Sequence, residues 1–109
     1  MSTKASLPAQ LSAATLDGPG DTDAGLRRSV NARAAAHATG ARLPALPEPL
    51  VAYVDKVALH AWRITDDDTT ALRVAGYSDD DIFELTIAAA AGAGLARLDR
   101  GLAALKGEI

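Results

Sequence analysis

The sequence contains no cysteine. A chain without thiols cannot form a disulfide, a thiolate metal site or an iron–sulfur cluster, and it has no cysteine nucleophile. Aromatic residues are also scarce, at 4% of 109 residues, and about half of the hydrophobic residues are alanine. Alanine and leucine favour helices, whereas strands are enriched in β-branched and aromatic residues. The composition therefore predicts an all-α fold with closely packed helices.

The chain also lacks an excess of positive charge, with 11 basic and 14 acidic residues. A protein that binds nucleic acid needs clustered cations to neutralise the phosphates, so a nucleic-acid partner is not expected. The longest apolar run, Ile87–Leu95, is far shorter than the roughly 20 residues that span a bilayer. Since the N-terminal segment also lacks the apolar stretch of a secretory signal, we expect a cytoplasmic protein with no membrane partner.

Glycine and proline divide the chain into segments. Residues 1–22 are small and polar, show no helical period and include Gly18-Pro19-Gly20, which predicts a flexible N-terminal arm. Alternatively, loosely spaced leucines could dock this arm on a neighbouring subunit. We expect residues 23–109 to form a single helical domain. Three prolines lie in residues 43–49 and cannot share one helix, so we expect a stiff connection there.

The apolar spacing and the capping residues predict a bundle of about four main helices in this domain. The expected helices cover residues 23–39, 48–63, a short segment from Thr65 to Gly76, and 79–105. Asp21 or Thr22 could cap the first helix, in which Arg27, Arg28 and Asn31 are expected to face away from the core. In the second helix, Asp55 and Lys56 are expected to face solvent.

The last predicted helix is apolar on two sides. One line of residues lies at Ile82, Leu85, Ala89, Gly92, Ala93 and Ala96, and a second, heptad-like line at Ala91, Leu95, Leu98, Leu102 and Leu105. Such a helix needs two partners, and one could come from another subunit. Gly92 and Gly94 each weaken the helix by about 1 kcal/mol relative to alanine. We expect a closely approaching neighbour helix to offset this cost.

A longer pattern begins with Asp55-Lys56-Val57-Ala58. It continues with Asp66-Asp67-Asp68, Ala71-Leu72-Arg73-Val74-Ala75-Gly76-Tyr77-Ser78 and Asp81-Ile82-Phe83-Glu84-Leu85, and ends in the alanine-rich helix. In this pattern, residues 53–105 resemble the carboxymuconolactone decarboxylase / alkylhydroperoxidase D-like family. The resemblance implies an all-helical bundle that assembles as trimers or hexamers, and we therefore expect a homo-oligomer.

The same resemblance also indicates which reactions this chain can catalyse. Redox members of the family carry a C-x-x-C-x-x-x-H motif, whose cysteines correspond here to Ala61 and Ile64 and whose histidine corresponds to Asp68. None of the three residues is kept, so the resemblance implies a member without thiol peroxidase activity. A decarboxylase-type reaction would need acid–base groups at other positions.

Three residues are the candidates for such a reaction: His60, Asp68 and Tyr53. Tyr53, Lys56 and His60 share a helix face at i, i+3 and i+7 spacing, where an imidazole could act as a general acid or base. Asp68 could act as a base if the position of the lost histidine lines a pocket. The alternative for His60 is a histidine at a helix edge, bonded to a carbonyl or to water.

The sequence predicts neither a metal site nor a cofactor. His37 and His60 could form a two-histidine metal or haem site, but no ligand spacing supports this, and His37 fits better as a packed histidine near a helix end. The acidic triplets Asp66–Asp68 and Asp79–Asp81 each follow Thr65 or Ser78. Since acidic side chains stabilise a helix N-terminus, capping accounts for both triplets.

Three functions stay open from the sequence. The first is an oligomeric, non-catalytic or accessory subunit, with a catalytic partner subunit as one option. The second is a cofactor-free acid–base enzyme, of a decarboxylase or lactone-handling type, that uses a pocket near His60 and Asp68. The third is a binding module for a small molecule or metal at the same place.

Overall fold

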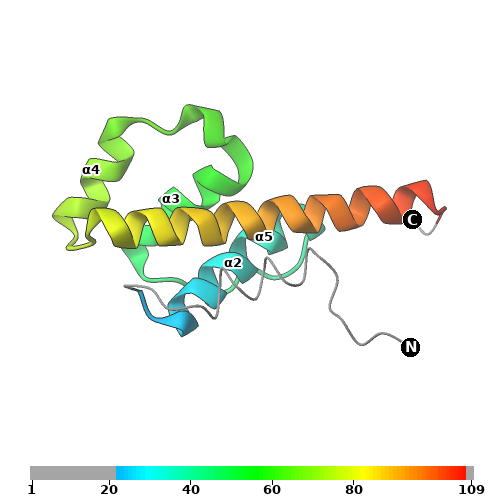
Figure 1. Ribbon diagram of the computed structural model, residues 1–109, viewed down its shortest axis with the longest axis horizontal. Helices are drawn as coiled ribbons and strands as arrows, with labels where there is room; N and C mark the ends of the chain where they lie inside the picture. Colours follow the sequence, from blue (N-terminus) through cyan, green and yellow to red (C-terminus); the bar gives the residue numbers. More distant parts are fainter. Residues whose placement is uncertain (1–21, 108–109) are drawn as a thin grey trace.

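The computed structural model describes residues 22–107, and this part of the chain consists of helices joined by loops, without strands (Figure 1). The elements are α2 (Ala24–Thr39), α3 (Glu48–His60), a 3₁₀ turn η1 (Ala61–Arg63), α4 (Asp66–Val74) and α5 (Asp79–Leu105). The predicted all-α class and the four predicted helices are confirmed. Apart from Thr22, the predicted N-terminal arm lies outside the described residues.

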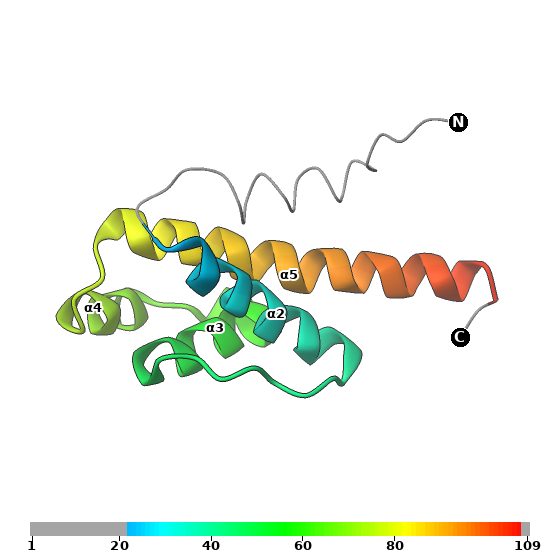
Figure 2. The same cartoon turned by 90° about the horizontal axis from the view of Figure 1, so that it is seen from below.

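Helix α5 is the longest element, and the other helices gather around its first half. Figures 1 and 2 show α2 and α3 beside this half and α4 near its N-terminal end. The C-terminal turns of α5 continue past the ends of these helices (Figure 2). None of the described helices is long and apolar enough to cross a membrane.

The core lies where α2, α3 and α5 meet, and small residues dominate it. Its largest fully buried side chains are Leu50, Leu72, Leu85, Val30 and Val54. Full burial of such a side chain contributes roughly 1.5–3 kcal/mol. Between them lie buried alanines, at Ala34, Ala58, Ala88, Ala89 and Ala93. Because alanine adds little bulk, the helix backbones come close together.

A close approach in this core joins α2 to α5 at Gly92. A Cβ atom added to Gly92 would lie 2.3 Å from the carbonyl oxygen of Asn31, which confirms the expected close neighbour. The side-chain Nδ2 of Asn31 also donates a hydrogen bond of 3.0 Å to the carbonyl of Ala88. Gly94 differs, because its added Cβ would meet no atom of the described residues within 4 Å.

The predicted orientation of α2 is wrong for two residues. Asn31 faces α5, and Arg27 is only 5% exposed, although both were expected to point away from the core. Helix α2 is made largely of alanine and polar residues, so it has no wide apolar face that fixes its rotation. Its contact with α5 is instead fixed by the close approach of the Asn31 backbone to Gly92, where there is no side chain, and by the hydrogen bond from Asn31 to the carbonyl of Ala88.

Polar caps set the starts of three helices. Asp23 caps α2, in place of the expected Asp21 or Thr22, and its Oδ2 accepts from the N–H of Leu26 at 3.1 Å. At α5, the N–H of Asp81 donates to Ser78 Oγ at 3.0 Å, and the N–H of Ser78 donates to Asp81 Oδ2 at 2.9 Å. In α4, Asp68 fills the corresponding position after Thr65. Capping is therefore the observed role of Asp68 and Asp81.

We expect Gly92→Ala to lower the free energy of unfolding by about 1–3 kcal/mol, because the new Cβ forces the backbone at Asn31 to move. Urea unfolding followed by far-UV circular dichroism measures this change. Gly101→Ala is the matched control in the same helix, since its Cβ meets no described atom within 4 Å. The control should keep or raise stability by up to about 1 kcal/mol. Equal losses in both variants would contradict the interpretation.

Candidate functional site

Tyr53, the first candidate catalytic residue, is buried in the core at 7% exposure. Its hydroxyl lies 2.6 Å from Thr86 Oγ1, and the Thr86 hydroxyl donates to the carbonyl of Ile82 at 2.6 Å. Because Thr86 has one hydroxyl proton and uses it on Ile82, Tyr53 is the donor to Thr86. This chain of hydrogen bonds joins α3 to α5 and places the Tyr53 hydroxyl in a structural role.

Asp68, the second candidate, has partners for both carboxylate oxygens. Lys56 Nζ lies 3.0 Å from Oδ1 and 2.8 Å from Oδ2, and the N–H of Thr65 donates to Oδ2 at 2.8 Å. The hydrogen bond from Lys56, followed by that from Thr65, lowers the pKa of Asp68 below its usual value. A carboxylate held in its ionised form in this way is a weak base.

His60, the third candidate, is the last residue of α3 and is exposed. Its ring meets Trp62 edge to face, with a distance of 5.3 Å between the ring centroids, and Trp62 is itself 77% exposed. The structure thus gives His60, Tyr53 and Asp68 separate partners. Among the described residues, no hydrogen bond or ion pair joins one of the three to another.

A different polar cluster, which the sequence analysis missed, centres on Asp55. Arg33 Nε lies 2.7 Å from Asp55 Oδ1 and Arg33 Nη2 lies 2.8 Å from Oδ2, so the pair is bidentate. His37 Nε2 lies 2.7 Å from Oδ1, and Arg33 Nη1 also donates to the carbonyl of Pro44 at 3.0 Å. Asp55 and Lys56 were expected to face solvent, and both instead form ion pairs.

This Arg33–His37–Asp55 cluster ties α2 to α3 and to the connection between them. The hydrogen bond from Arg33 is the main reason that the pKa of Asp55 is lowered, and His37 adds to the effect against the opposing effect of burial. The side chains of Arg33 and His37 are only 12% and 15% exposed. A substrate therefore has little access to the imidazole, and the cluster is a structural clamp.

The i, i+4 spacing of Arg33 and His37 was the one signal in the sequence for this cluster. A guanidinium and an imidazole on one face of a helix favour an anionic acceptor opposite them, and Asp55 supplies it. The partner lies 22 residues from Arg33, so only the packing of α2 on α3 identifies it.

Arg97 forms a further clamp, between α5 and the end of α3. Its Nη2 donates to the carbonyl of Ala58, which is among the last carbonyls of α3 and lacks a partner within that helix. A ligand-anchoring role for this guanidinium is not needed to explain its position.

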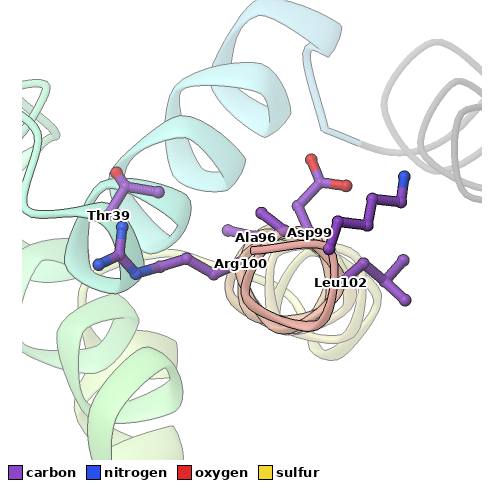
Figure 3. A pocket seen from close by; sticks show the side chains of 7 residues that line it. Thr39, Ala96, Asp99, Arg100 and Leu102 are labelled. Atoms are coloured by element: carbon purple, nitrogen blue, oxygen red, sulfur yellow. The ribbon is translucent and has the colours of Figure 1, made fainter. Parts of the chain in front are cut away.

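A surface pocket lies between the C-terminal end of α2 and the extended part of α5, with a volume of about 490 Å³. Thr39, Ala96, Asp99, Arg100, Leu102, Ala103 and Lys106 line it (Figure 3). The Arg100 side chain extends towards Thr39, while Asp99 projects from another side of the helix (Figure 3). None of the three candidate catalytic residues lines this pocket.

The described residues contain no group of three or more His, Cys, Asp or Glu side chains that could hold a metal ion. His37, one member of the two-histidine alternative, is bound to Asp55, and the other, His60, packs against Trp62. The acidic residues in the first turns of α4 and α5 stabilise the N-termini of these helices.

The second line of α5 remains exposed in part. Leu98 and Leu102 are 47% and 45% exposed, and Leu105 is 85% exposed. In the first half of the helix the exposed apolar line passes through Ile87, which is 42% exposed. We define the α5 stripe as the six exposed residues Ile87, Ala90, Gly94, Leu98, Leu102 and Leu105.

We expect Asp55→Asn to lower the free energy of unfolding by about 1–3 kcal/mol, because Arg33 loses a bidentate carboxylate and His37 loses an anionic acceptor. Urea unfolding at neutral pH measures the loss. Asp99→Asn is the control, since it removes an exposed charge that has no ion pair among the described residues. The interpretation fails if the two variants lose the same stability.

Acid should weaken the protein through Asp55 and Asp68. Both pKa values are lower in the folded chain than the usual 3.8, so the unfolded chain binds these protons more readily. Their stabilising contribution is complete above the unfolded pKa and is lost as the pH falls through the folded pKa. Urea midpoints measured from neutral to acidic pH should drop below about pH 4. The drop should be smaller in Asp55→Asn, and an unchanged pH profile would contradict the assignment.

Comparisons of the chain with protein-family models, curated proteins and solved structures gave no match.

Proposed function

We propose that the chain is a non-catalytic, self-associating helical subunit, or an accessory subunit beside a catalytic partner, of the carboxymuconolactone decarboxylase-like kind. The chain has no cysteine, so it has no peroxidatic thiol of its own. The resemblance of residues 53–105 to the family supports the proposed kind of subunit. The surface of α5 supports self-association.

The observation that carries the proposal is the α5 stripe. Isolated exposed hydrophobic residues are common on soluble proteins, but a contiguous apolar patch marks an interaction site. The stripe runs for 19 residues along one helix, and no charged residue belongs to it. Its C-terminal half lies on the part of α5 that extends past α2 and α3, where a partner can approach it (Figure 2).

The energetics make the association sensitive to single substitutions. Complete burial of a leucine contributes roughly 1.5–3 kcal/mol, and the stripe leucines have about half or more of their surface left to bury. Association costs about 4–15 kcal/mol in lost freedom of motion. The free energy gained by burying the stripe leucines and the free-energy cost of association are of similar size. One charge placed in the stripe is therefore enough to shift the equilibrium towards the monomer.

The contacts of two candidate catalytic residues, Asp68 and Tyr53, favour a structural role for both. Asp68 forms an ion pair with Lys56 and caps the start of α4, and the Tyr53 hydroxyl donates a hydrogen bond to Thr86. An acid–base enzyme needs such groups free to exchange protons with a substrate. These partners would have to be displaced before a substrate could reach either group.

We expect the wild-type protein to be oligomeric and Leu98→Asp to shift it towards the monomer, because a carboxylate in the buried stripe loses its hydration without gaining a partner. Size-exclusion chromatography with light scattering, across a concentration series, measures the mass. Val74→Asp is the matched control, since Val74 is 84% exposed but lies on α4. Its mass should equal that of the wild type.

Two results would contradict this proposal. One is a monomeric wild-type protein throughout the concentration series. The other is turnover of a substrate by the isolated protein that is lost in His60→Ala or Asp68→Gln while the fold is kept, because that result makes the chain an enzyme.

A further inference from the structure

We infer that the α5 stripe recognises a second copy of itself, with the two α5 helices antiparallel about a two-fold axis at Ala96. The inference rests on the proposed function and adds to it the occupant of the surface, the direction of the partner helix and its register. Spacing, side-chain size, charge and the side of α5 on which the stripe lies each contribute to it.

The spacing of the stripe reads the same in both directions. Successive members are separated by 3, 4, 4, 4 and 3 residues, and the midpoint is Ala96. Phe83, which is 66% exposed, extends the same line by four residues, and its counterpart in the second copy, position 109, lies outside the described residues. A two-fold interface requires a surface that matches its own reversed copy. With the axis at Ala96, Ile87 lies opposite Leu105 of the second copy, Ala90 opposite Leu102, and Gly94 opposite Leu98.

Side-chain size favours the antiparallel direction. In that register the leucines at 98 and 102 face Gly94 and Ala90 of the other copy, so each of these two leucines meets a small residue, and Ile87 meets Leu105 at the two ends of the stripe. In a parallel pair in register, each residue meets its own copy, which crowds leucine against leucine and leaves a void at Gly94. Helix interfaces pack densely when large and small residues alternate across them.

Gly94 supports the same register independently. Glycine weakens a helix interior, and at Gly92 the close contact with Asn31 accounts for its presence. Gly94 has no such neighbour among the described residues. A leucine of a second copy that fits against Gly94 supplies the missing close approach.

Charge along α5 is also reversed between its ends. The first half carries Asp79, Asp80, Asp81 and Glu84, whereas the second half carries Arg97, Arg100 and Lys106 together with one carboxylate, Asp99. With the axis at Ala96, Lys106 lies opposite Thr86 of the second copy, within one turn of Glu84, and the two helix dipoles oppose each other. A parallel pair would place the two acidic first turns side by side.

The stripe lies on the side of α5 opposite the core. At 3.6 residues per turn, Leu85, Ala89 and Gly92 form the core-facing line, and the α5 stripe falls about half a turn away from it. The bodies of two copies therefore lie on the outer sides of the helix pair, and α2 and α3 do not block the approach.

The absence of cysteine allows a direct test, because each introduced cysteine is the only thiol in its chain. Ile87→Cys and Leu105→Cys are made separately, and the two proteins are mixed and treated with a mild oxidant. Both sites are exposed, at 42% and 85%, so the fold should tolerate them, which far-UV circular dichroism confirms. Non-reducing electrophoresis and mass spectrometry then identify any cross-linked dimer.

We expect the mixture to give a disulfide between positions 87 and 105, and each variant alone to stay uncross-linked. In the antiparallel pair, identical positions lie 18 residues apart along the axis, or roughly 27 Å, whereas a disulfide needs Cα atoms within about 7 Å. The control is a mixture of Ile87→Cys with Arg100→Cys, which lies on the far side of the helix and should not cross-link.

Each other outcome overturns the inference in a recognisable way. Cross-linking of each variant alone indicates a parallel pair. Equal cross-linking in the Arg100→Cys control indicates random collision. An oligomeric wild type whose mixture does not cross-link places the interface on another surface and leaves the proposed function intact. A monomeric wild type removes both the inference and the proposed function.

Discussion

The close contact between α2 and α5 is the constraint on which the rest of the fold depends. The Asn31 backbone lies so near Gly92 that no side chain fits between the two helices, and the Asn31 amide bonds to the carbonyl of Ala88 at the same place. This contact fixes both the rotation of α2 and its distance from α5. With that rotation, Arg33 and His37 face α3, where Asp55 joins them. A shift of α2 by one residue would move both side chains away from the carboxylate.

A core of alanine and a few larger residues provides limited apolar burial, and polar clamps complete the packing of the helices. The bond from Tyr53 to Thr86 and the bond from Arg97 to the Ala58 carbonyl join α3 to α5. The ion pair of Lys56 with Asp68 joins α3 to α4. Each clamp uses a residue type that also occurs in catalytic sites. These residue types therefore look like a catalytic set in the sequence. In the structure, their donors and acceptors are already paired inside the chain.

The sequence predicted the helices well, because their ends are set by local chemistry. The prolines before Pro49, the glycines at Gly40 and Gly76, and the Ser78 cap all act within a few residues of the boundary. The pairing of distant side chains was not predictable in the same way. Asp55 meets Arg33 only because of how α2 and α3 cross, and apolar periodicity does not encode that crossing. Helix α2 shows the limit clearly, since it has almost no apolar face to orient it and Asn31 was assigned to the wrong side.

The end of α5 connects the fold to the proposed assembly. In the described part of the chain, the buried residues of α5 stop at Ala93, yet the helix continues to Leu105. Among the described residues, the bond from Arg97 to the Ala58 carbonyl is the one side-chain hydrogen bond that joins this segment to another helix. A short helical segment with few tertiary contacts is marginal in water, and Gly101 weakens this one further. An apolar stripe on such a segment gains most when a partner covers it, because burial then stabilises the helix and the interface together. Ordering of the last turns of α5 and self-association are therefore coupled in the proposed dimer, and the stripe is the feature that couples them.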